Sequence, residues 1–126
     1  MNISEYIKKH QETILTKRIV ISTDVKYDVR THETCVIKGV IYLIKGYRIE
    51  FSEYIVIKFG EIIKLKYRYT IVDNKNNVLI RWDNAPHHKH LLTYPHHKHV
   101  GNNILPSKEV WIWDVLDEAE KILLHK

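Results

Sequence analysis

Histidines are concentrated in one short stretch of this chain. Six of the nine lie between Pro86 and His99, where the pentapeptide Pro-His-His-Lys-His occurs twice, at 86–90 and 95–99. Imidazole is the usual general acid and base near neutral pH and the commonest metal ligand. The two prolines restrict the backbone and so lower the entropy lost on ordering a site. The candidate catalytic residues in and before this stretch are Asp83, His87, His88, His90, His96, His97 and His99.

The spacing of these histidines favours acid–base chemistry over metal binding. The chain has no His-Glu-x-x-His, zinc-knuckle or facial-triad pattern, and adjacent histidines usually point to different sides. We therefore expect no bound metal and no other cofactor. Two alternatives stay open. One is a metal site, and the other is a structural loop whose histidines bond to backbone groups around Leu91, Leu92 and Tyr94.

Glu53 is a further candidate catalytic residue, because the expected strand register puts it on an otherwise apolar face. A two-residue turn at Lys45-Gly46 places Lys38 opposite Glu53, and the next hairpin places Tyr69 opposite Glu53. As a functional group, Glu53 would be a base with a raised pKa beside Tyr69 and the nearby histidines. As a structural group, it would form a cross-strand ion pair with Lys38.

The opposite face of the same strands is rich in cations. A cationic sheet with an aromatic ring can hold phosphates while the ring stacks on a base, as single-strand RNA binders do. Solvated lysines on an exposed sheet are the alternative interpretation, and Arg68 lies opposite Asp83, with which it could simply pair. The candidate substrate-binding residues are Tyr54, Lys64, Lys66, Arg68, Tyr69 and Arg81.

Strands must position these residues. The segment from Lys17 to Asp83 is rich in Ile, Val, Tyr and Thr and alternates apolar with polar side chains. Turns are expected at Thr31-His32, Lys45-Gly46, Gly60-Glu61-Ile62 and Asn74 to Asn77. Such short breaks predict five strands in an antiparallel meander. In this register, the second strand turns Val36, Lys38, Val40 and Tyr42 toward the apolar face.

Helices are expected at both ends of the chain. Apolar residues recur at helical spacing from about Ser4 to Ile14, with Ser4 as the cap. After Pro106, Ser107 caps a second segment, in which one stripe is apolar. The stretch from Asn84 to Leu105 lacks periodicity. We expect an α+β fold with an antiparallel meander sheet of five or more strands, and with the N-terminal and C-terminal helices on one face.

Length and composition fit an ordinary globular protein. With 126 residues, 44% of them hydrophobic, we expect one domain over residues 1–126. The single Cys35 excludes an internal disulfide. No apolar run reaches roughly 18 residues, and the first ten residues lack the apolar core of a signal peptide, so the expected location is the cytoplasm, without a membrane partner. A net charge of +5 favours nucleic acid or an acidic protein as partner.

The histidine stretch also carries a family resemblance. Arg81-Trp82-Asp83-Asn84-Ala85-Pro86-His87-His88, followed by Tyr94-Pro95-His96-His97-Lys98-His99, resembles the TumE family of prokaryotic toxin–antitoxin proteins. The resemblance extends to the segments 50–54, 66–69, 73–76 and 105–107, and so covers about residues 48 to 124. It implies a small toxin encoded with an antitoxin, often one that bears a helix-turn-helix domain. Small toxins of this size commonly attack RNA, which is an analogy of class rather than of site.

The residues and the resemblance together predict a toxin that acts on RNA as a metal-independent ribonuclease. The basic face would position phosphates, and two histidines, or Glu53 and a histidine, would supply the base and the acid. One alternative is a non-enzymatic module that inhibits its target by contact and is neutralised by its antitoxin. The other is a metal-dependent hydrolase with histidine ligands. The expected partners are a cognate antitoxin and RNA, and a homodimer is left open.

Overall fold

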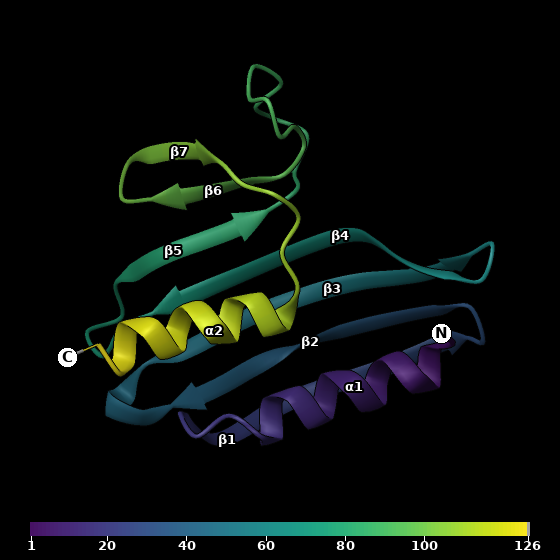
Figure 1. Ribbon diagram of the computed structural model, residues 1–126, viewed down its shortest axis with the longest axis horizontal. Coiled ribbons are helices and arrows are strands. Elements are labelled where there is room, and N and C mark those ends of the chain that lie inside the picture. Colours follow the sequence, from purple (N-terminus) through teal and green to yellow (C-terminus); the bar gives the residue numbers. More distant parts are fainter. Residues whose placement is uncertain (126) are drawn as a thin grey trace.

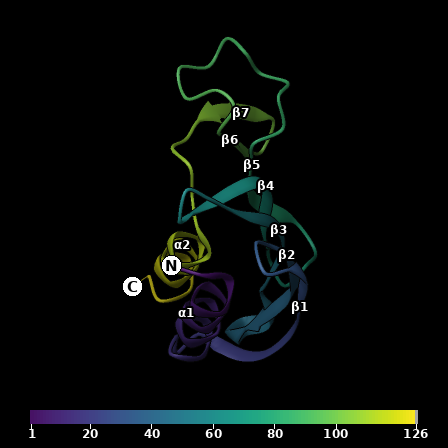
Figure 2. The ribbon, with the colours of Figure 1, turned by 90° about the vertical axis from the view of Figure 1, so that its right-hand side faces the viewer.

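The computed structural model describes residues 1–125 and contains two helices and a seven-stranded sheet. The elements run α1 (Ile3–Leu15), β1 (Val20–Thr31), β2 (Thr34–Leu43), the 3-10 turn η1 (Ile44–Gly46), β3 (Arg48–Lys58), β4 (Glu61–Val72), β5 (Val78–Asp83), β6 (His97–Val100), β7 (Asn103–Pro106) and α2 (Ile112–Leu123). The strands pair antiparallel in chain order, and both helices lie on one face of the sheet (Figures 1 and 2). The expected α+β meander is confirmed.

The two helices bury their apolar stripes against the sheet. Asn2, rather than Ser4, caps α1, since its side chain accepts from Glu5 N at 2.8 Å while the Glu5 carboxylate accepts from Asn2 N. The second helix begins at Ile112, five residues after the expected cap at Ser107, and the Asp114 carboxylate accepts from Trp111 N at its first turn. Among the described helices, none is long and apolar enough to cross a membrane.

The first hairpin turns one residue later than the sequence suggested, at His32-Glu33, with Thr31 opposite Thr34. A register shift between Val29 and Thr31 then places Val29 opposite Cys35. Since side chains alternate along a strand, this odd residue exchanges the two faces of β2. The prediction for this strand was therefore wrong. Its buried residues are Cys35, Ile37, Ile41 and Leu43, whereas Val36, Lys38, Val40 and Tyr42 lie on the face away from the helices, which we call the open face.

The registers on either side of β3 also differ from expectation. A three-residue turn at 44–46 puts Ile37, not Lys38, opposite Glu53. A two-residue turn at Phe59-Gly60 and a bulge that leaves Leu65 unpaired put Tyr67, not Tyr69, opposite Glu53. The pairs Tyr69–Trp82 and Arg68–Asp83 between β4 and β5 are as predicted.

The stretch expected to lack periodicity is only partly a loop. Residues 97–100 and 103–106 form β6 and β7, which extend the sheet beyond β5. Arg81 lies opposite His99, and Asp83 lies opposite His97. The second Pro-His-His-Lys-His block therefore enters the sheet, while the first block remains in the connecting loop (Figure 1).

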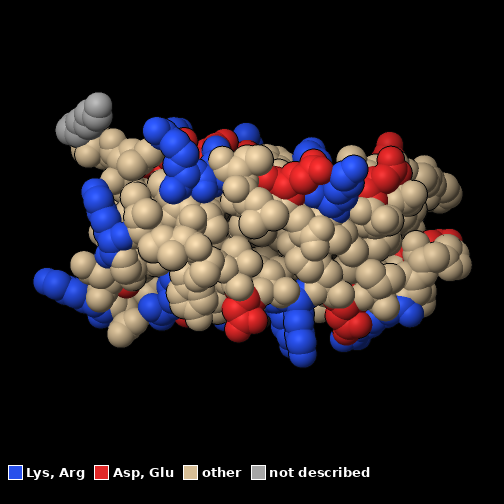
Figure 3. Space-filling view, turned by 90° about the horizontal axis from the view of Figure 1, so that it is seen from below, with Lys and Arg blue, Asp and Glu red and all other residues tan. Residues whose placement is uncertain are grey.

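Charge is unevenly distributed on the side formed by α1 and β1. In the view from below, charged side chains gather along two rims, with a largely uncharged strip between them (Figure 3). Exposed apolar residues of α1 and β1 include Leu15, Ile21 and Val29.

Candidate functional site

Two neighbouring strands and one loop bring four of the predicted catalytic residues together on the open face. Asp83 ends β5, His97 and His99 lie on β6, and His88 comes from the loop between these strands. Because alternate residues share a face, Asp83, His97 and His99 point to the same side. The His97 ring centroid lies 4.8 Å from that of His88 and 5.0 Å from that of His99. We call these four residues with Arg81 the histidine cluster.

Asp83 is the centre of the histidine cluster. Its Oδ1 lies 2.9 Å from His97 Nε2 and accepts a hydrogen bond from Ala85 N at 3.0 Å. Its Oδ2 lies 3.5 Å from His99 Nε2 and 3.4 Å from Arg81 Nε. The carboxylate is buried, so these contacts offset the loss of its hydration. Asp83 can therefore orient His97, and it lies beside His99 and Arg81.

His97 is a positioning residue rather than a group that could reach a substrate. It is 2% exposed, and its Nδ1 lies 2.9 Å from the carbonyl oxygen of Pro95. A carbonyl and a carboxylate both only accept hydrogen bonds, so each ring nitrogen of His97 lies beside an acceptor. His97 therefore fixes the position of Asp83 relative to the loop.

His99 and His88 are the partly exposed imidazoles of the cluster. Arg81 Nη2 lies 3.2 Å from His99 Nε2, and since guanidinium only donates, this nitrogen must accept. Burial and the charge of Arg81 lower the pKa of His99 below its usual value. Desolvation and the neighbouring histidines likewise lower the pKa of His88. A neutral His99 is suited to accept a proton.

Arg81 retains hydrogen-bonding capacity. Its Nε is buried and has no hydrogen-bond partner within residues 1–125, because the 3.4 Å approach to Asp83 lacks hydrogen-bond geometry. About a third of its side chain is exposed. A guanidinium at a surface with unused donors can bind a phosphate oxygen.

The donor set fits a metal poorly. One nitrogen each of His88, His97 and His99 lie within 4.8 Å of one another, and zinc would need each of them at about 2.0–2.1 Å with a free lone pair. Both nitrogens of His97 already contact acceptors, and His99 Nε2 faces a guanidinium. A metal ion would also experience repulsion from Arg81. The arrangement favours acid–base chemistry.

The remaining loop histidines lie outside the cluster or at its rim. His87 and His90 are exposed, and the His90 ring lies 6.1 Å from that of His88. His96 stacks on Tyr67, and its Nδ1 lies 2.9 Å from the tyrosine hydroxyl. Burial lowers the pKa of His96. His96 thus belongs to the packing around Tyr67.

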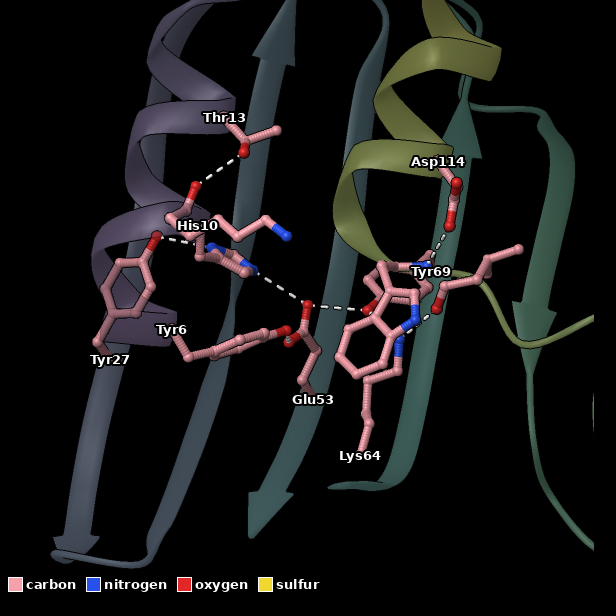
Figure 4. Close-up of polar contacts among 11 residues, drawn as sticks. Tyr6, His10, Thr13, Tyr27, Glu53, Lys64, Tyr69 and Asp114 are labelled. Carbon is pink, nitrogen blue, oxygen red and sulfur yellow. Dashed lines mark hydrogen bonds and ion pairs between the residues drawn. The ribbon is translucent and has the colours of Figure 1, made fainter. Parts of the chain in front are cut away.

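Glu53 lies on the other face of the sheet, beneath the helices (Figure 4). It is 1% exposed and has no contact with Lys38. Its carboxylate accepts from Tyr6 Oη at 2.5 Å and Tyr69 Oη at 2.8 Å, and lies 3.0 Å from His10 Nε2. The sheet therefore separates Glu53 from the histidine cluster, and we leave Glu53 out of the proposed chemistry.

The pKa of Glu53 is lowered, not raised as the sequence suggested. Burial by itself raises it, but the hydrogen bond and charge of His10, the charge of Lys64 and the hydrogen bond from Tyr6 outweigh that effect. Glu53 is accordingly a stabilised carboxylate. Sequence reasoning missed the contacts of Glu53 with Tyr6 and His10. Both residues lie on the apolar stripe of α1, where a polar side chain such as that of His10 was a signal of a buried polar partner.

Lys64 and Tyr69 were expected to bind substrate, and the structure places both in the core. They are 4% and 0% exposed. Lys64 donates to Tyr69 Oη at 2.8 Å and to the Val110 carbonyl, and burial lowers its pKa to about 8. The cause is the bulge opposite Tyr54, which turns Lys64 toward the helices. Tyr54, Lys66 and Arg68 are exposed on the open face, as predicted.

Comparison with known proteins identifies the family. The family model described as Toxin TumE matches residues 10–123. No curated protein and no solved structure matches the chain. The match begins well before residue 48, where the resemblance in the sequence starts, and so includes the second half of α1 and the strands β1 and β2. A match over nearly the whole length shows that this chain belongs to the TumE toxin family.

Proposed function

We propose that this member of the TumE toxin family cleaves RNA without a metal ion, at the histidine cluster. The observation that supports the proposal is the arrangement on β5 and β6. Buried His97 and Asp83 contact each other, the pairing of β5 with β6 places a neutral His99 beside Arg81, and His88 faces them from the loop. The reaction requires one group that accepts a proton, one group that donates a proton and one cation that binds the phosphate.

The reaction needs no group beyond those in the cluster. An incoming phosphodiester draws Arg81 to a phosphate oxygen, which frees the lone pair on His99 Nε2. His99 takes the proton of the ribose 2′-hydroxyl, the O2′–P bond forms and the P–O5′ bond breaks. A protonated His88 donates its proton to the departing O5′, and the products are a 2′,3′-cyclic phosphate and a 5′-hydroxyl. Arg81 offsets the negative charge that develops on the non-bridging phosphate oxygens.

The purified protein is expected to cut a synthetic single-stranded RNA in the presence of excess EDTA, and to leave the DNA oligonucleotide of the same sequence intact. DNA lacks the 2′-hydroxyl that attacks phosphorus. Gel electrophoresis of end-labelled substrates with and without EDTA measures this. Loss of cleavage in EDTA with recovery on adding Mn²⁺ or Zn²⁺ would support a metal-dependent hydrolase instead. Binding without cleavage in any condition would support a contact inhibitor.

The rate of cleavage is expected to be highest on the acid side of pH 6.5. The reaction requires neutral His99 and protonated His88, and both pKa values lie below the usual histidine value of about 6.5. The fraction of the protein that has both a neutral His99 and a protonated His88 is therefore largest below pH 6.5, and it falls as pH rises through 7 and 8. Initial rates between pH 4.5 and 8.5 measure the profile, and a maximum above pH 7 would contradict these roles.

A toxin family implies an antitoxin partner. We propose that the antitoxin carries a helix-turn-helix domain, is acidic over its contact surface, and meets the toxin in the cytoplasm, where RNA is the target. The net charge of +5 supports an acidic partner. Co-expression with the product of the adjoining gene is expected to restore growth and to co-purify the two proteins.

A further inference from the structure

The open face carries a row of cations that leads across the sheet to the histidine cluster. The strand registers place Lys26 opposite Lys38, Lys38 opposite Ser52, Ser52 opposite Arg68, Arg68 opposite Asp83, and Asp83 opposite His97. Directly opposed residues of neighbouring strands share a face. These six positions therefore form one line from β1 to β6, which we call the cross-strand row.

The cations of the cross-strand row have no partners of opposite charge. Lys26, Lys38 and Arg68 are exposed, and none makes an ion pair within residues 1–125. Two lysines directly opposite each other destabilise a sheet. In neighbouring rows, Asp28 and Glu50 have partners, since Arg30 lies 3.3 Å from Asp28 and Arg48 lies 2.7 Å from Glu50, whereas the exposed Asp24 makes no ion pair within residues 1–125. The row has the charge pattern of a surface that meets a polyanion.

The surface is hollowed along the row. A cavity of about 410 Å³ is lined by residues that include Lys26, Arg30 and Lys38, and another of about 310 Å³ by residues that include Lys66, Arg68 and Asp83. Both volumes fall in the range of small-molecule pockets, roughly 300–1,000 Å³. Tyr54, two residues from Ser52 on the same face, offers an exposed aromatic ring between them. A nucleobase can stack on such a ring.

We propose that the cross-strand row is the binding track for single-stranded RNA, with phosphates on Lys26, Lys38 and Arg68 and a base on Tyr54, and that it delivers the strand to the histidine cluster. This inference rests on the proposed function. With strands about 4.8 Å apart, five steps from β1 to β6 span about 24 Å, which suits roughly four extended nucleotides. A single strand is favoured because stacking on Tyr54 requires an unpaired base. The sequence assigned no role to Lys26, and it assigned Lys38 only an ion pair with Glu53.

The test measures binding separately from cleavage. All proteins carry His99→Ala to prevent turnover, and fluorescence anisotropy follows a fluorescein-labelled 12-nucleotide single-stranded RNA at several salt concentrations. Lys26→Ala with Lys38→Ala is compared with Lys8→Ala and Lys121→Ala, which remove the same charge from exposed positions on α1 and α2. The track predicts that the row variant binds about tenfold more weakly at 0.1 M salt. The slope of the logarithm of its association constant against the logarithm of the salt concentration should also be shallower, by about 0.7 for each lost phosphate contact.

Each result decides between the proposals. Equal affinities of the row variant and the helix-face control would overturn the track, even if the wild-type protein cleaves RNA. Weakened RNA binding in the row variant alone supports the track, even if no cleavage is found and the proposed function fails. A row variant that loses the antitoxin but binds RNA normally would assign the row to protein recognition and overturn the track. A 12-base-pair duplex that competes as well as the single strand would overturn the assignment to single strands.

Discussion

Glu53→Gln is expected to lower the free energy of unfolding by about 3–5 kcal/mol at pH 7, the usual effect of removing one partner from a buried charged network. Glutamine keeps the size of the side chain but lacks the charge that Lys64 and His10 face. Glutamine also has an amide nitrogen in place of one carboxylate oxygen, and this nitrogen cannot accept the hydrogen bond that a tyrosine hydroxyl now donates (Figure 4). Urea denaturation followed by tryptophan fluorescence gives the value. The exposed neighbour Glu50→Gln, on the opposite face of the same strand, is the matched control and should change stability by less than about 1 kcal/mol.

The same variant has a defined pH dependence. The pKa of Glu53 is lower in the folded protein than its ordinary value, so its stabilisation is present at neutral pH and is lost as pH falls through the folded pKa. The difference in stability between wild type and Glu53→Gln should therefore shrink on acidification below pH 4. A difference that stays constant from pH 7 to pH 3 would mean that the carboxylate charge is not what stabilises the core.

His99→Ala is expected to reduce kcat/KM for RNA at least about a hundredfold, because general bases typically contribute 10²–10⁴-fold. His99 is partly exposed at the end of the sheet, so the melting temperature should change little. His32→Ala, whose side chain is 90% exposed in the turn between β1 and β2, is the matched control and should retain full activity. A fully active, folded His99→Ala protein would remove this histidine from the mechanism.

The fold was predictable to the extent that periodicity and turn residues determine it. Alternation gave the strands and their antiparallel order, and the apolar stripes gave both helices. Register was less accessible, because it depends on irregularities such as the shift between Val29 and Thr31, which slips β2 by one residue and which alternation of side chains does not reveal. The apolar Ile37, Ile41 and Leu43 on the supposed polar face were the visible signal of the slip, and in the structure all three are buried.

The histidine cluster was predictable in composition but not in geometry. The repeated Pro-His-His-Lys-His block marked the segment, yet only the pairing of β6 with β5 selects His97 and His99 to face Asp83 and leaves His96 against Tyr67. The surroundings of Glu53 could not be derived from strand parity, because its partners Tyr6 and His10 come from a helix at the other end of the chain. Contacts between distant elements depend on packing, which local patterns do not encode.

The central claim is tested most directly by the ends that cleavage leaves on RNA. A 12-nucleotide single-stranded RNA is incubated with the wild-type protein in excess EDTA, and the products are analysed by mass spectrometry. Attack by the 2′-hydroxyl, with His99 as the base, predicts fragments that end in a 2′,3′-cyclic phosphate and begin with a 5′-hydroxyl, and no such fragments with His99→Ala. Fragments with a 3′-hydroxyl and a 5′-phosphate, or intact RNA at every pH between 4.5 and 8.5, would contradict it.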